Sequence, residues 1–232
     1  MDNIANLPTH VGVIMDGNRR WAKSQGLPTF DGHQKGYNNL RELVLYALKE
    51  RGVKYLSAFV FSTENWSRAQ EEVGYLMNLV LRALKDHLDE FHRENVRIVV
   101  MGTRDKLKPN IIAAIEKAES TTKRNTGGTV ALCFNYGGQQ EIVDAAKKLL
   151  EAGANPANLT IEDFAAQLYH PDIPPLDLVI RTSGEQRLSG FMLWRSSYAE
   201  FLFMEKHWPE FTKKDIDFAL DEYSKRQRRY GA

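Results

Sequence analysis

Asp16 ends a short apolar run and stands directly before Gly-Asn, a pattern that could bind a metal ion together with an anion. Residues 11–15 predict a buried strand, Gly17 allows a tight turn, and the next residues can begin a helix whose free N–H groups attract an anion. Mg²⁺ takes few protein ligands and keeps oxygens from water or substrate, so one carboxylate near Arg20 suits a metal-bound diphosphate. Ordinary turn chemistry at Asp-Gly-Asn is the alternative at this point.

Two further apolar runs also end in polar side chains. Residues 176–180 lead into a glycine-containing loop that carries Arg181, Arg187 and Ser189. Arginine binds phosphate oxygens through paired hydrogen bonds, although surface ion pairing would use the same residues. The other run is followed by Ser-Thr-Glu-Asn-Trp-Ser-Arg at residues 62–68. Because ligands of open α/β sheets bind at the carboxyl ends of strands, the three strand ends predict one site.

Strands and helices alternate along the chain. The expected strands are residues 11–15, 53–61, 96–101, 129–134, 177–180 and 201–204. Apolar residues at helical spacing predict helices around residues 40–48, 73–91, 109–115 and 142–150, a short helix after Thr160 and a last helix from Thr212. This alternation predicts an α/β fold with a mainly parallel central sheet of about six strands, covered by helices on both faces.

The composition fits one compact domain over residues 1–232. The chain is 43% hydrophobic and 26% charged, enough to bury one sizeable core, and a net charge of +1 gives no reason to expect nucleic acid. The lone Cys133 lies in an apolar run, which predicts a small buried side chain and a reducing compartment. The start of the chain lacks a basic and apolar leader, and no window approaches 18 apolar residues, so we expect a cytoplasmic protein without a transmembrane segment.

Taken together, these motifs show that the chain resembles the cis-prenyltransferases, most closely the bacterial undecaprenyl diphosphate synthases. The residues that carry the resemblance, in the family's order and nearly its spacing, are 10–23, 32–36, 61–68, 135–138 and 181–189, with Trp194, Tyr198 and Glu200. The resemblance implies a Mg²⁺-dependent transferase that condenses isopentenyl diphosphate with an allylic diphosphate, usually farnesyl diphosphate. The implied product is a cis-polyprenyl diphosphate such as undecaprenyl diphosphate, the lipid carrier precursor for cell-wall glycan synthesis.

The resemblance also implies roles for individual residues. Asp16 would hold Mg²⁺ with help from Glu200, and Asp16, His33 and Asn65 are the catalytic candidates. The positions implied to bind the two substrates are Gly17, Asn18, Arg20, Trp21, His33, Ser62, Asn65, Trp66, Arg68, Arg181, Arg187 and Ser189. The proton acceptor stays open, because the Asn65 amide is a weak base and the released diphosphate could take the proton instead.

The resemblance further implies a tunnel and a homodimer. The apolar stripe of residues 73–91 would line a tunnel for the growing chain, although ordinary core packing needs the same spacing. Residues 200–208 would lie near the dimer contact, unless residues 201–204 form one more buried strand. The product would be delivered to a membrane. The basic residues 225–229 would complement the dipole of a helix end, with contact to an anionic membrane surface as the alternative.

Three departures from the family pattern leave the starter and the product length open. Thr29 stands where most members carry an arginine that binds the allylic diphosphate, and Gly190 stands where asparagine is usual. Lys23 or Lys35 could supply the missing cation. Val60 stands where a small alanine is common, so the tunnel would be narrower here.

Two other classes of function are weighed against prenyl transfer. A non-catalytic partner subunit would not need the diphosphate-binding residues that this chain carries. A phosphate hydrolase on a similar sheet would need a nucleophile or a second metal-binding carboxylate beside Asp16, and the sequence offers no clear pair.

Overall fold

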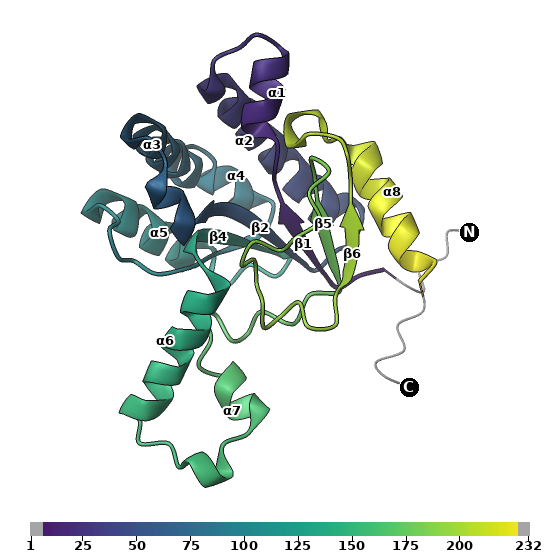
Figure 1. Ribbon diagram of the computed structural model, residues 1–232. Helices are drawn as coiled ribbons and strands as arrows, with labels where there is room; N and C mark the ends of the chain where they lie inside the picture. Colours follow the sequence, from purple (N-terminus) through teal and green to yellow (C-terminus); the bar gives the residue numbers. More distant parts are fainter. Residues whose placement is uncertain (1–6, 227–232) are drawn as a thin grey trace.

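The chain folds around one six-stranded sheet in which every strand pair is parallel (Figure 1). We describe residues 7–226 of a computed structural model of the protein. The strands are β1 (His10–Ile14), β2 (Tyr55–Ser62), β3 (Arg97–Met101), β4 (Thr129–Tyr136), β5 (Leu178–Arg181) and β6 (Glu200–Phe203), in the order β3-β4-β2-β1-β5-β6. The predicted α/β fold with about six parallel strands is confirmed.

Eight α-helices are found in residues 7–226. They are α1 (Asn18–Ser24), α2 (Thr29–Leu45), α3 (Gln70–Asp86), α4 (Leu88–Arg93), α5 (Pro109–Thr122), α6 (Gly138–Glu151), α7 (Ile161–Ala165) and α8 (Lys213–Ser224). Two differ from expectation. The helix predicted over residues 73–91 is broken at His87, whose φ of −114° ends α3 before α4 begins. Helix α2 begins at Thr29, well before residue 40. The sequence pattern missed its first turns because Gly32 and Gly36 interrupt the apolar spacing that marks the later turns.

The two faces of the sheet are covered differently. Residues of α2, α3, α5 and α8 form the larger core cluster with one face of the sheet. The other face packs largely on irregular segments that contain Ile173, Leu176 and Phe191, so the prediction of helices over both faces is only partly right. Gly12 in β1 allows this close packing, because a Cβ there would lie 2.7 Å from Cε1 of Phe191.

Helices α1 and α2 approach each other closely beside the end of β1. A Cβ on Gly32 would lie 2.2 Å from the backbone oxygen of Asn18, and one on Gly36 would lie 2.3 Å from Asn18 Oδ1. Two glycines four residues apart on one helix face therefore let α2 pack on the first turn of α1. This contact fixes the turn that follows Asp16.

Cys133 lies in the core of the sheet. It is completely buried, and burial raises the pKa of its thiol well above the usual value, so its role as a small apolar side chain is confirmed.

Two expectations concerned membranes and the end of the chain. Among residues 7–226, no helix is both long and apolar enough to cross a membrane. Helix α8 ends at Ser224, and residues 227–229 of the basic tail, which include Arg228 and Arg229, lie outside the described residues.

Candidate active site

The carboxyl ends of β1 and β5 bring Asp16 and Arg181 together. These neighbouring strands pair with Ile14 opposite Arg181, two residues before Asp16. Gly17 follows with a φ of +102°, a left-handed conformation in which glycine is favoured. A Cβ at this position would also lie 2.7 Å from the ring of His207. The tight turn predicted at Gly17 is therefore confirmed, and α1 begins at Asn18.

Asp16 is held by two guanidinium groups. Its Oδ2 accepts a hydrogen bond of 2.9 Å from Arg181, and its Oδ1 lies 3.1 Å from Arg20 Nη2. Partial burial alone would raise the pKa of Asp16, but Arg181 and Arg20 outweigh this effect and lower it. The side chain is therefore an anion at neutral pH.

Arg181 and Arg20 also reach into the loop after β5. Arg181 is buried and donates a 2.9 Å hydrogen bond to Ser189 Oγ. Arg20 donates 3.0 Å to Glu185, whose other oxygen lies 2.5 Å from Arg187. Glu185, which the sequence did not mark as important, thus holds two of the predicted diphosphate ligands.

His33 lies on α2 and points to a carboxylate that sequence reasoning missed. His33 Nε2 lies 3.1 Å from Glu72 Oε1, and the same oxygen accepts a 3.0 Å bond from Arg68. Burial lowers the pKa of His33 more than Glu72 raises it. The spacing of four residues between Arg68 and Glu72 was visible in the sequence, but their meeting with α2 depends on the tertiary fold.

Most of the predicted residues line one polar cleft of about 850 Å³. The predicted residues in its wall are Asp16, Gly17, Asn18, Arg20, His33, Ser62, Asn65, Arg68, Arg181 and Ser189. Thr29 and Lys23 also line the cleft, whereas Lys35 does not. Of the two lysines considered as a substitute cation, Lys23 is the one in the cleft wall.

Three predicted substrate-binding residues lie outside this wall. Trp66 packs edge-on against Phe61 and donates a 2.7 Å hydrogen bond to Asn135 Oδ1. Trp21 does not line the cleft, and Arg187 is 60% exposed and turned toward Glu185. Trp66 thus has a structural contact and Arg187 an exposed position, whereas Trp21 is half-buried outside the cleft wall.

The two predicted metal ligands, Asp16 and Glu200, do not meet within one chain. Glu200 begins β6 and pairs with Leu178, whereas Arg181, beside Asp16, pairs with Phe203 at the other end of that strand. Three residues of extended strand separate the two levels by roughly 10 Å. Glu200 accepts a 2.8 Å bond from Arg226 instead.

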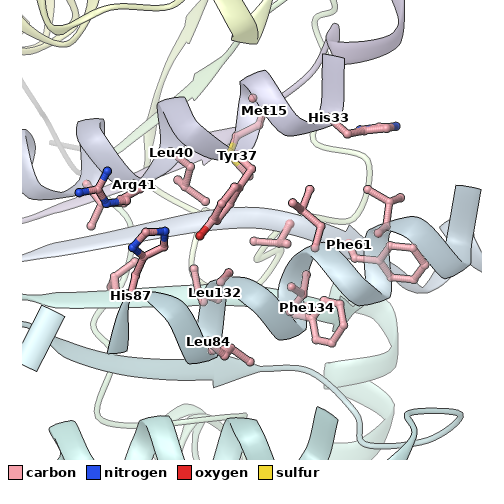
Figure 2. Close-up of a pocket in the computed structure, with 18 of the residues that line it drawn as sticks. Met15, His33, Tyr37, Leu40, Arg41, Phe61, Leu84, His87, Leu132 and Phe134 are labelled. Carbon is pink, nitrogen blue, oxygen red and sulfur yellow. The ribbon is translucent and has the colours of Figure 1, made fainter. Parts of the chain in front are cut away.

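An apolar cavity of about 120 Å³ continues from the cleft between the sheet, α2 and α3 (Figure 2). Five residues line both spaces: Met15, Asn18, His33, Val60 and Leu76. In Figure 2, His33 lies at one end of the cavity and Arg41 and His87 at the other, with the ring of Tyr37 between them. A polar cleft that opens into an apolar cavity can bind a molecule with an anionic head and a hydrocarbon tail.

Comparison with known proteins identifies the family. A family model described as "Putative undecaprenyl diphosphate synthase" matches residues 14–231. The chain belongs to this family. An isoprenyl transferase from Thermotoga maritima is 46% identical over 227 residues, 97% of each chain. A Thermobifida fusca protein named trans,polycis-polyprenyl diphosphate synthase ((2Z,6E)-farnesyl diphosphate specific) is 47% identical over 97% of this chain and 81% of its own length.

Solved structures of prenyl diphosphate synthases share the fold. Lavandulyl diphosphate synthase from Lavandula x intermedia, in complex with dimethylallyl diphosphate, matches with a TM-score of 0.92 and 33% identity over the whole of both chains. A probable undecaprenyl diphosphate synthase from Campylobacter jejuni matches with a TM-score of 0.83 and 32% identity over 98% of this chain and all of that one. The family resemblance and the prenyltransferase class predicted from the motifs are both confirmed.

Proposed function

We propose that this isoprenyl transferase condenses isopentenyl diphosphate with an allylic diphosphate, most simply farnesyl diphosphate, to make a cis-polyprenyl diphosphate. The observation that carries the proposal is the junction at which the cationic cleft opens into the apolar cavity. The two spaces match the two halves of such a substrate, because diphosphate needs guanidinium and N–H donors while the prenyl chain needs apolar walls. The cavity then serves as the entrance of the product tunnel, and undecaprenyl diphosphate is one product of this class.

Residues on the two sides of the cleft bind the two different diphosphates. Gly17 makes the turn and donates its N–H to Asp16 Oδ1 at 2.7 Å, and Asn18 follows at the start of α1 with its backbone N–H toward the cleft. Arg20 and Lys23 line the same wall, so this side binds the allylic diphosphate. Arg181 and Ser189 bind isopentenyl diphosphate on the side of β5, with Arg187 moving in from the exposed loop. Fixed cations around the leaving diphosphate stabilise the negative charge that it gains as the C–O bond breaks.

The other predicted side chains are placed to orient the substrates. Ser62 and Asn65 line the cleft at the end of β2, where Asn65 Oδ1 accepts a 3.1 Å bond from the Ser62 N–H. This bond fixes the Asn65 side chain, so that its amide N–H groups face away from the strand and are available to a diphosphate. Asn65 therefore acts as a ligand and not as a base.

Mg²⁺ fits the cleft as an ion with one protein ligand. Asp16 is an ionised oxygen donor among cations, whereas residues 7–226 contain no group of three or more His, Cys, Asp or Glu side chains that could hold a metal. Asp16 would therefore hold Mg²⁺ with diphosphate oxygens and water as its other ligands. When bound, Mg²⁺ would neutralise diphosphate charge and make that group a better leaving group.

Assembly and destination belong to the same proposal. We place a homodimer contact at the edge strand β6, where Phe203 is 36% exposed, and we propose that the product passes to a membrane from a cytoplasmic enzyme. Trp208 is not available to such a contact, because it is 1% exposed and donates a 2.8 Å bond to the Gly36 oxygen. Sedimentation at micromolar concentration tests the dimer, which a purely monomeric active enzyme would exclude.

The test of the proposed activity is incubation with labelled isopentenyl diphosphate and either geranyl or farnesyl diphosphate, in Mg²⁺ or in EDTA. We expect polyprenyl products that depend on Mg²⁺ and disappear in the Asp16→Ala variant. Folded protein that makes no product with either starter would point to the non-catalytic partner, and release of phosphate from either substrate without chain growth would point to a hydrolase.

A further inference from the structure

Glu72 is a buried carboxylate directly behind three residues that line the cationic cleft. It lies in the first turn of α3, is 8% exposed, and binds cationic or titratable side chains from three different segments. Its Oε1 lies 3.1 Å from His33 on α2 and 3.0 Å from Arg68, and its Oε2 lies 3.9 Å from Arg19 on α1. A negative charge beside the cleft weakens anion binding, so this carboxylate needs another explanation.

The hydrogen bond to Glu72 decides the protonation of the His33 ring. His33 and Arg68 lower the pKa of Glu72 despite its burial, so the carboxylate is ionised and can only accept hydrogen bonds. His33 must therefore carry a proton on Nε2. Because burial lowers the pKa of His33, the ring is neutral at pH 7 and its second nitrogen, Nδ1, is unprotonated.

The His33 ring lies next to the place where the reacting bond of the substrate would be. This inference rests on the proposed function. His33 lines both the polar cleft and the apolar cavity. An allylic diphosphate bound across the junction has its diphosphate in the cleft and its chain in the cavity, so the C–O bond between them lies beside His33. When this bond breaks, its electron pair leaves with diphosphate and positive charge develops on the allylic carbon.

We propose that Glu72 is a positioning residue of the transfer reaction, which fixes the neutral ring of His33 at the junction and holds Arg68 beside the cleft. A neutral ring with a carboxylate behind it favours positive charge on the adjacent carbon, whereas an imidazolium would oppose it. The same carboxylate directs the Arg68 guanidinium toward the wall of the cleft. Glu72 therefore weakens the binding of anionic substrates in the ground state but lowers the activation barrier of the transfer.

The matched variants are Glu72→Gln and Glu71→Gln, which remove one charge each from the same turn of α3. Glu71 is exposed and does not line the cleft, so its variant should match wild type. For Glu72→Gln we expect a kcat about 10- to 100-fold lower, the scale for losing the partner that orients a functional histidine. Inorganic pyrophosphate, measured by calorimetry, should bind as tightly as to wild type or more tightly. An unchanged kcat, or an equal loss of kcat and pyrophosphate affinity, would contradict the proposal.

A double-mutant cycle tests whether Glu72 acts through His33. In a His33→Ala background, Glu72→Gln should lower kcat by much less than in wild type, because two residues that act as a unit are not additive. Independent, multiplicative losses would overturn the proposed route. These experiments distinguish failure of the proposed function from failure of the Glu72 proposal. An inactive wild type rejects prenyl transfer. An active wild type with a fully active Glu72→Gln variant rejects only the role of Glu72.

Discussion

Arg181 Nη2 lies 2.9 Å from Asp16 Oδ2, so the cation proposed to bind isopentenyl diphosphate and the proposed metal ligand are bonded to each other. Arg181 is 4% exposed and cannot turn to water when its partner changes. Under the proposed function, a bound diphosphate would therefore take the place of Asp16 on the guanidinium, and Asp16 would be released toward Mg²⁺. Each group is held near its working position by the other before the ligands arrive.

The first prediction concerns removal of this carboxylate. Asp16→Ala should lower kcat/KM by at least about 100-fold, the scale for losing one preorganised electrostatic group. The variant should also be less stable by about 1–3 kcal/mol, because the buried Arg181 loses a charged partner. Steady-state kinetics and urea unfolding check both effects. The exposed carboxylate Asp89 supplies the control: Asp89→Ala should leave kcat/KM unchanged and cost less than about 1 kcal/mol, the contribution of an acidic side chain in the first turn of α4.

The second prediction concerns Glu185, which binds Arg20 at 3.0 Å and Arg187 at 2.5 Å. This carboxylate occupies two guanidinium groups that the substrates need. Glu185→Gln should lower the KM for isopentenyl diphosphate by roughly two- to fivefold, the range expected for exposed ion pairs, and leave kcat little changed. Initial rates over a range of isopentenyl diphosphate concentrations test this. A higher KM would show that Glu185 positions the loop and does not compete with substrate.

The third prediction concerns product length. Val60 lines the junction. In Figure 2 the ring of Tyr37 lies in the apolar cavity, between His33 at one end and His87 at the other. A cavity of about 120 Å³ is below the 300–1,000 Å³ typical of ligand pockets, so bulk removed here should admit more chain. Val60→Ala and Tyr37→Ala should each shift the products to longer chains. Tyr37→Phe is the control and should leave the product length unchanged, because it keeps the ring. Mass spectrometry of the products measures the chain lengths. An unchanged distribution in Val60→Ala and Tyr37→Ala would mean that neither side chain limits growth.

The strand ends were predictable from the sequence because apolar runs that stop at Asp, Ser or Arg mark both the element and its polar edge. This is why the sequence predicts that Asp16, Ser62 and Arg181 meet at one site, and all three line the same cleft. The role of Glu72 was not predictable, because a glutamate in the first turn of a helix usually faces water and only the packing of α2 on α3 buries it. The separation of Glu200 from Asp16 within one chain was not predictable either, because a motif gives sequence distance from Arg181 but not the direction of the next strand.

The fourth prediction uses pH and a histidine remote from the cleft. His10 is fully buried, with Nε2 2.7 Å from Ser57 Oγ and Nδ1 2.8 Å from the Pro174 oxygen. Burial lowers the pKa of His10 from 6.5 to about 4, despite the hydrogen bond to Pro174, which raises it. As the pH falls below 6.5, the unfolded chain takes up this proton before the folded chain does. The protein should therefore lose about 3 kcal/mol of stability between pH 6.5 and pH 4.

Urea unfolding of wild type and His10→Gln across this range isolates the contribution of His10. The variant should be less stable at pH 7.5, because glutamine cannot reproduce both hydrogen bonds, but its stability should fall less steeply between pH 6.5 and pH 4. Equal slopes in the two proteins would mean that His10 is already protonated in the folded state.

The last prediction separates glycine as a contact from glycine as a weak helix former. A Cβ on Gly32 would lie 2.2 Å from the Asn18 backbone oxygen, whereas a Cβ on Gly74 in α3 would meet nothing within 4 Å. Gly32→Ala should push α1 away from α2, cost about 1–3 kcal/mol and lower activity, because α1 carries the anion-binding turn. Gly74→Ala should instead add up to about 1 kcal/mol, as alanine favours a helix interior over glycine. Thermal unfolding of both variants gives the comparison, and equal gains would show that the two helices are not held together by this close approach.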